Sequence, residues 1–247
     1  MKLSKEEKAA NRAAFKKMNL LQKADYIFTY YKVPIIAIAV PLIFLSHMLY
    51  LHFTRREPML YCGFINVAVG QQLENQLTTG FVVSMDANPD KYTVYTYSDL
   101  FLLSDPSSEE HQYAYASRMK LLATIQNQTM DVVLMNREAY DILSANGYLL
   151  SLPDLLSPEV GSAADLAPYL VDNTVILEDN QIEFDLGTAD EYWAQTQQAV
   201  NGLDVSGFRM FTEAGYSDEL YLGVIGNTAR PEMVRHYIGY LNMDQQY

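Results

Sequence analysis

Four polar residues directly follow or end apolar segments that have a strand pattern, so they are the side chains best placed to bind a ligand. Ser98 and Asp99 lie near the end of one such segment, and Asn136 and Arg137 follow another. In an open parallel sheet the carboxyl ends of the strands meet at one edge, where ligands bind beside helix N-termini. If the chain has a small-molecule site, these four residues are our candidates for it. The more ordinary interpretation of each is a structural role as a turn residue or helix cap.

A catalytic site is a weaker interpretation. An activated nucleophile needs a base within hydrogen-bond reach, and the chain beyond residue 56 contains only His111 and His236, in very different contexts. The G-x-S-x-G motif, the phosphate-binding loop and the dinucleotide fingerprint do not occur. We therefore predict that the protein is not an enzyme and uses no cofactor.

One segment has a partial metal-binding pattern. Asp86, Asn88 and Asp90 have the first spacings of a calcium loop, in which oxygen ligands alternate along the chain. Lys91 replaces the required glycine, and Tyr97 replaces the closing glutamate. The sequence therefore predicts no metal site.

Charge divides the chain into two parts of opposite sign. Residues 1–56 contain ten Lys and Arg and three acids, which gives +7, whereas residues 57–247 contain seven Lys and Arg and 27 acids, which gives -20. A domain this acidic repels phosphate backbones, so we exclude nucleic acid as its partner.

The boundary between these parts is an apolar segment that predicts a transmembrane helix. The 21 residues from 33 to 53 contain no Asp, Glu, Lys or Arg, and about 20 apolar residues cross the hydrocarbon core of a bilayer. Pro41 predicts a kink in the middle of the span. The basic residues before the span predict a cytoplasmic tail over residues 1–32, and residues 57–247 then form an extracytoplasmic domain.

Two other forms of membrane targeting fit less well. A cleaved signal peptide also has a basic start and an apolar middle, but this segment is longer and no small-x-small pattern follows it. Cys62 is the sole cysteine, and the bulky Tyr61 precedes it, which disfavours a lipoprotein anchor. A single cysteine also excludes an intrachain disulfide.

The tail itself has two recognisable features. Residues 4–7 have the spacing of a capping box and predict a helix over residues 5–18, which either lies on the lipid bilayer or only enforces topology. Residues 23–35, KADYIFTYYKVPI, resemble the juxtamembrane segment of a group of single-pass membrane proteins of Gram-positive Firmicutes. This resemblance implies a compartment and no activity.

After Pro58, short apolar segments alternate with amphipathic ones, which predicts an α/β domain with a mostly parallel sheet. The predicted strands cover residues 60–69, 92–103, 131–135 and 220–225, and the predicted helices cover residues 71–83, 109–126, 137–145 and 231–241. We further expect a hairpin over residues 171–186 that turns at Asp179 and Asn180, and a helix over residues 189–200. In such a sheet the loops 70–71 and 226–227 lie at the same edge as the four candidate residues.

This order of elements resembles one lobe of an extracellular solute-binding protein of the ABC-transporter type. The resemblance is carried by DVVLMN at residues 131–136, by GYLLSL at 147–152 and by LGVIGN at 222–227. It implies a reduced form of that fold, because residues 157–217 are too few for the second lobe of that family, which is then missing or reduced.

The sequence thus predicts a non-enzymatic, membrane-tethered binding or interaction module, and the resemblance implies an accessory of a transporter or envelope complex. Whether a small molecule binds is left open. The alternative is a structural or sensory single-pass protein that acts through its tail and transmembrane helix.

Overall fold

The computed structural model describes residues 18–103, 111–156 and 163–243. The chain forms two compact units, Met1–Arg55 and Arg56–Tyr247. The helix that we predict over residues 5–18 falls almost wholly outside the described residues.

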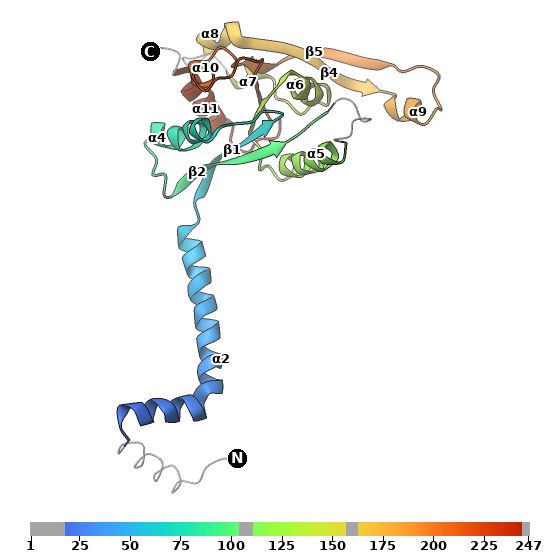
Figure 1. Cartoon of the computed structure of the whole chain (residues 1–247). Helices are drawn as coiled ribbons and strands as arrows, with labels where there is room; N and C mark the ends of the chain where they lie inside the picture. Colours follow the sequence, from blue (N-terminus) through green and yellow to red (C-terminus); the bar gives the residue numbers. More distant parts are fainter. Residues whose placement is uncertain (1–17, 104–110, 157–162, 244–247) are drawn as a thin grey trace. The chain divides into compact units, whose positions relative to one another are not determined.

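The first unit contains the long helix α2 (Leu20–Thr54). Within it, Lys32–Thr54 is long and apolar enough to cross a membrane, and both a membrane span and a signal sequence meet this criterion. Figure 1 shows a sharp bend in the N-terminal half of α2, the half that contains Pro34. A proline ring clashes with the carbonyl four residues earlier, so Pro34 accounts for the bend. Figure 1 shows no comparably sharp bend in the C-terminal half of α2, the half that contains Pro41.

The second unit is built on one six-stranded sheet in the order β2-β1-β3-β6-β5-β4. Strand β1 pairs in parallel with β2 and β3, whereas the pairings of β3 with β6, β6 with β5 and β5 with β4 are antiparallel. Because β6 reverses the direction and β5 restores it, β2, β1, β3 and β5 run the same way and the sheet is mainly parallel. The strands are β1 (Glu57–Ile65), β2 (Tyr92–Leu100), β3 (Val132–Met135), β4 (Leu170–Asp179), β5 (Ala194–Asp204) and β6 (Tyr221–Val224).

Helices pack on both faces of this sheet. Side chains alternate between the faces of a strand, so Val132 and Leu134 of β3 face one apolar cluster while Val133 and Met135 face the other. The first cluster includes side chains of α3 (Gln71–Asn75), the π-helix η1 (Gln76–Gly80), α4 (Phe81–Ser84), α7 (Leu152–Leu155), α8 (Ala163–Leu166), α10 (Arg209–Glu213) and α11 (Pro231–Met243). The second includes side chains of α5 (His111–Gln126) and α6 (Arg137–Ala145). The short η2 (Ala167–Tyr169) and α9 (Gln181–Asp185) complete the described elements.

Two of the predicted elements are wrong, and both lie in the β4–β5 hairpin. Residues 189–200 do not form a helix, because β5 begins at Ala194. The hairpin does not turn tightly at Asp179 and Asn180, since the chain turns over residues 180–193 and includes α9. The outer half of β5 is exposed, so no alternation of apolar and polar residues marks it as a strand.

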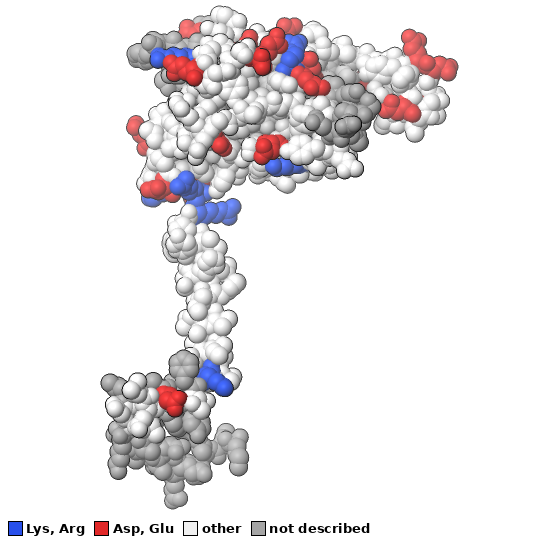
Figure 2. All heavy atoms as spheres, in the orientation of Figure 1, with Lys and Arg blue, Asp and Glu red and all other residues white. Residues whose placement is uncertain are grey.

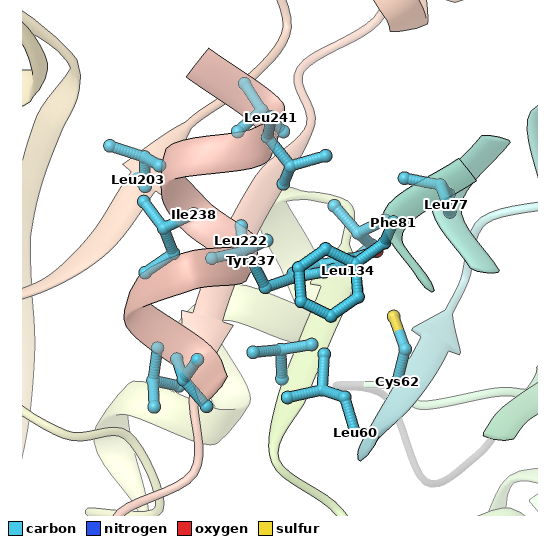
Figure 3. Packing of buried hydrophobic residues seen from close by; sticks show 14 of the residues in the cluster. Leu60, Cys62, Leu77, Phe81, Leu134, Leu203, Leu222, Tyr237, Ile238 and Leu241 are labelled. Atoms are coloured by element: carbon cyan, nitrogen blue, oxygen red, sulfur yellow. The ribbon is translucent and has the colours of Figure 1, made fainter. Parts of the chain in front are cut away.

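Cys62 lies in the centre of the first apolar cluster. Its side chain is fully buried, and Figure 3 shows the sulfur among Leu60, Phe81 and Tyr237. Burial disfavours the thiolate and raises the pKa of Cys62 to about 12. Since the thiolate is the reactive form, this cysteine is inert in the folded protein.

We predict that Cys62 resists alkylation in the folded protein. Iodoacetamide should leave the thiol unmodified throughout the range below its raised pKa, and a denaturant should expose it only as the domain unfolds. Mass spectrometry of the intact chain measures this without ambiguity, because the chain has one cysteine. Rapid modification of the native protein would show that the first apolar cluster is open to solvent.

Candidate functional site

The carboxyl ends of β1, β2 and β3 meet at one edge of the sheet, and Asn66 connects the loops there. The Nδ2 of Asn66 donates to the carbonyl of Leu102 at 2.7 Å and to Oδ1 of Asn136 at 3.3 Å. The same Oδ1 of Asn136 accepts from the backbone N–H of Ala139 at 3.0 Å and so caps α6. The side-chain oxygen of Asn136 is thus engaged within the protein.

The other predicted site residues have local roles at this edge. Arg137 lies 3.0 Å from Asp141 one helical turn away, and its NH1 donates to the hydroxyl of Tyr221 at 3.3 Å. Ser98 and Asp99 are exposed near the end of β2, and no described contact joins either of them to Asn136 or Arg137. The structure therefore brings the four predicted residues to one edge of the sheet as two separate pairs.

Two further features separate this edge from a ligand-binding cleft. Strand β6 is antiparallel to β3, so the loop 226–227 lies at the opposite edge of the sheet and our predicted place for it is wrong. At that opposite edge, Asn227 Nδ2 donates to the carbonyl of Ile125 at 2.8 Å. Strands β4 and β5 extend the same sheet, so the described part of residues 157–217 builds no second lobe.

One hollow and one buried acid among the described residues belong to local structure. A hollow of about 860 Å³ is lined only by residues 71–83 of the continuous segment α3, η1 and α4, so it lies along one helical segment and not between elements. The buried Asp131 accepts from the Tyr61 N–H at 2.8 Å and from the Thr228 hydroxyl at 2.5 Å, and Arg230 lies 3.4 Å away. Among the described residues, no group of three or more His, Cys, Asp or Glu could hold a metal ion.

A different surface stands out at the far end of the β4–β5 hairpin, which projects beyond the helical layers in Figure 1. We define the hairpin tip as residues 177–193. Ile182 and Leu186 are each 72% exposed, and Trp193 is 50% exposed. The large apolar residues exposed on the tip are Leu177, Ile182, Phe184, Leu186, Tyr192 and Trp193. Soluble proteins rarely gather so many exposed apolar side chains unless the surface binds something.

The hairpin tip has an ordered structure because of Asn180. The side chain of Asn180 is buried, accepts from the N–H of Trp193 at 2.8 Å and donates through Nδ2 to the carbonyl of Glu191 at 2.9 Å. The rings of Phe184 and Tyr192 meet edge to face, with 6.1 Å between centroids. These contacts tie the two ends of the loop together, so the tip presents its apolar side chains in a defined arrangement.

The hairpin tip is also strongly acidic. It contains six acids, Glu178, Asp179, Glu183, Asp185, Asp190 and Glu191, and the chain has no Lys or Arg between residues 138 and 208. In Figure 2 the projecting end of the domain carries red spheres and no blue ones on the face shown. The tip therefore combines exposed apolar groups with uncompensated negative charge.

Helix α6 holds the base of the hairpin through a buried polar network. The Tyr140 hydroxyl lies 2.9 Å from Oδ1 of Asn201, and Asn201 Nδ2 donates to Oγ of Ser144 at 2.9 Å. That Ser144 hydroxyl in turn donates to the carbonyl of Thr174 in β4 at 3.1 Å. Burial raises the pKa of Tyr140 above its usual value, so the hydroxyl stays protonated and can donate.

No family model, curated protein or solved structure significantly matches the chain. The resemblance to a solute-binding lobe is therefore not confirmed. Function has to be inferred from the geometry of the domain itself.

The hairpin tip is not among the site residues that we predict from the sequence. The signal was present in the long stretch without a basic residue and in the cluster of Ile182, Phe184 and Leu186. Their alternation predicted part of a hairpin, whereas the structure places them, exposed, on α9 and the turn that follows it. Exposure is set by the direction of the hairpin, and the local sequence does not specify that direction.

We predict that Gly202→Ala destabilises the domain by about 1–3 kcal/mol, the usual cost of overpacking. A Cβ at residue 202 would lie 2.5 Å from the Tyr140 ring. The fragment 57–247 suits the measurement, because it spans a compact unit with its own core and should fold alone. Denaturant unfolding gives the free energy.

Gly207→Ala is the matched control, because no atom lies within 4 Å of the added carbon. Its free energy of unfolding should stay close to that of the unaltered fragment. Equal stability of the two variants would show that α6 does not pack against β5 as described, and a fragment that failed to fold would contradict its independence.

Proposed function

We propose that this protein is a membrane-tethered interaction module whose extracytoplasmic α/β domain binds another protein through the hairpin tip. The observation that carries the proposal is the ordered cluster of exposed apolar side chains on residues 177–193. Aromatic anchors that become buried in pockets of the partner dominate the energetics of protein interfaces, and the tip offers Phe184, Tyr192 and Trp193 in that role.

The remaining features of the domain support binding rather than chemistry. The polar side chains at the carboxyl edge serve as caps and loop links, and the described helices and strands form a single layered body without a facing wall. A small ligand needs enclosure to bury its apolar surface, whereas a protein partner can supply the second surface itself. We therefore propose a non-enzymatic role.

The apolar stretch of α2 supports the tether. Its side chains from residue 33 onward are almost all exposed, as expected for a helix surrounded by lipid. The basic tail places the N-terminus in the cytoplasm in this proposal, and the domain then faces proteins of the envelope. A transporter or an envelope complex is the class of partner that we propose.

The same apolar stretch favours a second candidate function, in which the protein acts through α2 and its tail. In that case other membrane proteins would contact α2, and the outer domain would serve as a scaffold. The two functions differ in which part of the chain touches a partner.

Site-specific photocrosslinking in cells distinguishes them. We predict that p-benzoylphenylalanine in place of Phe184 gives a discrete crosslinked band with a protein, because this side chain lies in the hairpin tip. The same probe in place of Tyr115 on α5 is the control and should give no such band, although this ring is 60% exposed and that of Phe184 is 43% exposed. A band from Leu42 in α2, with none from Phe184, would support the second function and overturn the first.

A further inference from the structure

We propose that the partner of the hairpin tip presents a cationic, apolar-lined surface, with Lys or Arg around the pocket that receives the exposed side chains. This inference rests on the proposed function and adds the chemistry of the partner. The apolar groups at the tip and the six acids around them occupy the same short segment, so one partner surface has to satisfy both.

The charge of the tip is uncompensated within the hairpin. Residues 170–204 contain eight acids and no Lys, Arg or His. The ion pairs of the described residues involve Arg137, Arg209, Arg230 and Arg235, and none of them reaches an acid of the tip. Docking against a neutral or acidic surface would place these carboxylates near apolar groups or like charges without a partner. A cationic surface is the complement that attracts them.

Two other occupants fit this charge less well. An anionic bilayer surface repels acids and attracts Lys and Arg, so the tip does not have the composition of a membrane-inserting loop. In a symmetric dimer the same patch meets its own copy, and contact of two tips would bring twelve acids together, six from each. A protein with the opposite charge is therefore the occupant that we infer.

The tip contains its own reporter, because Trp193 is the sole tryptophan of the chain and is half exposed. Its emission shifts to shorter wavelength when the ring leaves water. The experiment titrates the full chain, in neutral detergent, with an amphipathic helical peptide of leucine and lysine. A peptide of leucine and glutamate with the same pattern is the charge control.

We expect the leucine–lysine peptide to shift the Trp193 emission and the leucine–glutamate peptide to leave it unchanged. The affinity should fall by about tenfold or more in about 1 M salt, where the Debye length is about 3 Å. The emission should be insensitive to protein concentration and to vesicles of phosphatidylglycerol or phosphatidylcholine.

A matched pair of variants assigns the effect to the tip. Neutralising four tip acids should weaken peptide binding by about tenfold, as expected when a charged complement is lost. The control removes four exposed acids elsewhere in the domain and should bind as the unaltered chain does. The tip variant carries Glu178→Gln, Glu183→Gln, Asp190→Asn and Glu191→Gln, and the control carries Asp86→Asn, Asp90→Asn, Asp154→Asn and Asp218→Asn.

Each contrary result overturns the inference in a recognisable way. Equal binding of both peptides, or an equal loss of peptide affinity in both variants, would show that the charge of the tip does not contribute to binding. A shift with protein concentration would identify a second copy as the occupant, and a shift with vesicles would identify lipid. If none of the probes shifts the emission while Phe184 still crosslinks to a protein, the cationic surface is wrong and the proposed function stands.

Discussion

The position of Tyr140 is the constraint on which the outer part of the domain depends. Its ring occupies the space beside Gly202 where any other residue would place a side chain, and its hydroxyl meets Asn201 in β5. Buried polar groups are costly unless they are satisfied, so Tyr140, Asn201 and Ser144 fix how α6 lies on the hairpin. The helix that carries Tyr140 is in turn capped by Asn136, which Asn66 contacts. The polar residues at the carboxyl edge thus position α6, and α6 positions the hairpin.

The two halves of the sheet differ in how much of their surface the helices cover. The parallel half of the sheet, β2, β1 and β3, lies between helices on both faces, as parallel sheets generally do. The antiparallel half ends in a hairpin whose outer strands have little cover. A surface that leaves the body in this way can reach a partner without a cleft, and the Asn180 contacts keep its loop ordered. The fold therefore suits binding through a projecting hairpin rather than through a cleft that encloses a ligand.

The sequence predicted the parallel half well because its signals are local. The apolar run at residues 132–135 forms β3, and Asn136 caps a helix that ends at Ala145, as predicted. The direction of β6 and the pairing of β5 with it depend on contacts between distant residues, so no local pattern reports them. Trp193 shows the limit most clearly. Its neighbours suggested a helix, whereas the buried Asn180, thirteen residues earlier, binds its N–H and fixes it at the start of β5. For a related reason, spacing alone does not reveal that Asn136 and Arg137 have partners within the fold.

Hydrogen exchange of the hairpin in the full chain tests the central claim most directly, because the account requires a tip that is ordered before any partner binds. The N–H of Trp193, which Asn180 binds, and the N–H of Thr188, which the carbonyl of Glu183 binds at 2.8 Å, should exchange far more slowly than in an unstructured peptide. Tyr140→Phe should accelerate exchange in β4 and β5 and leave β1 and β3 unchanged. Exchange of the tip at the unstructured rate in the unaltered protein would contradict the account, because residues 177–193 would then present no defined surface.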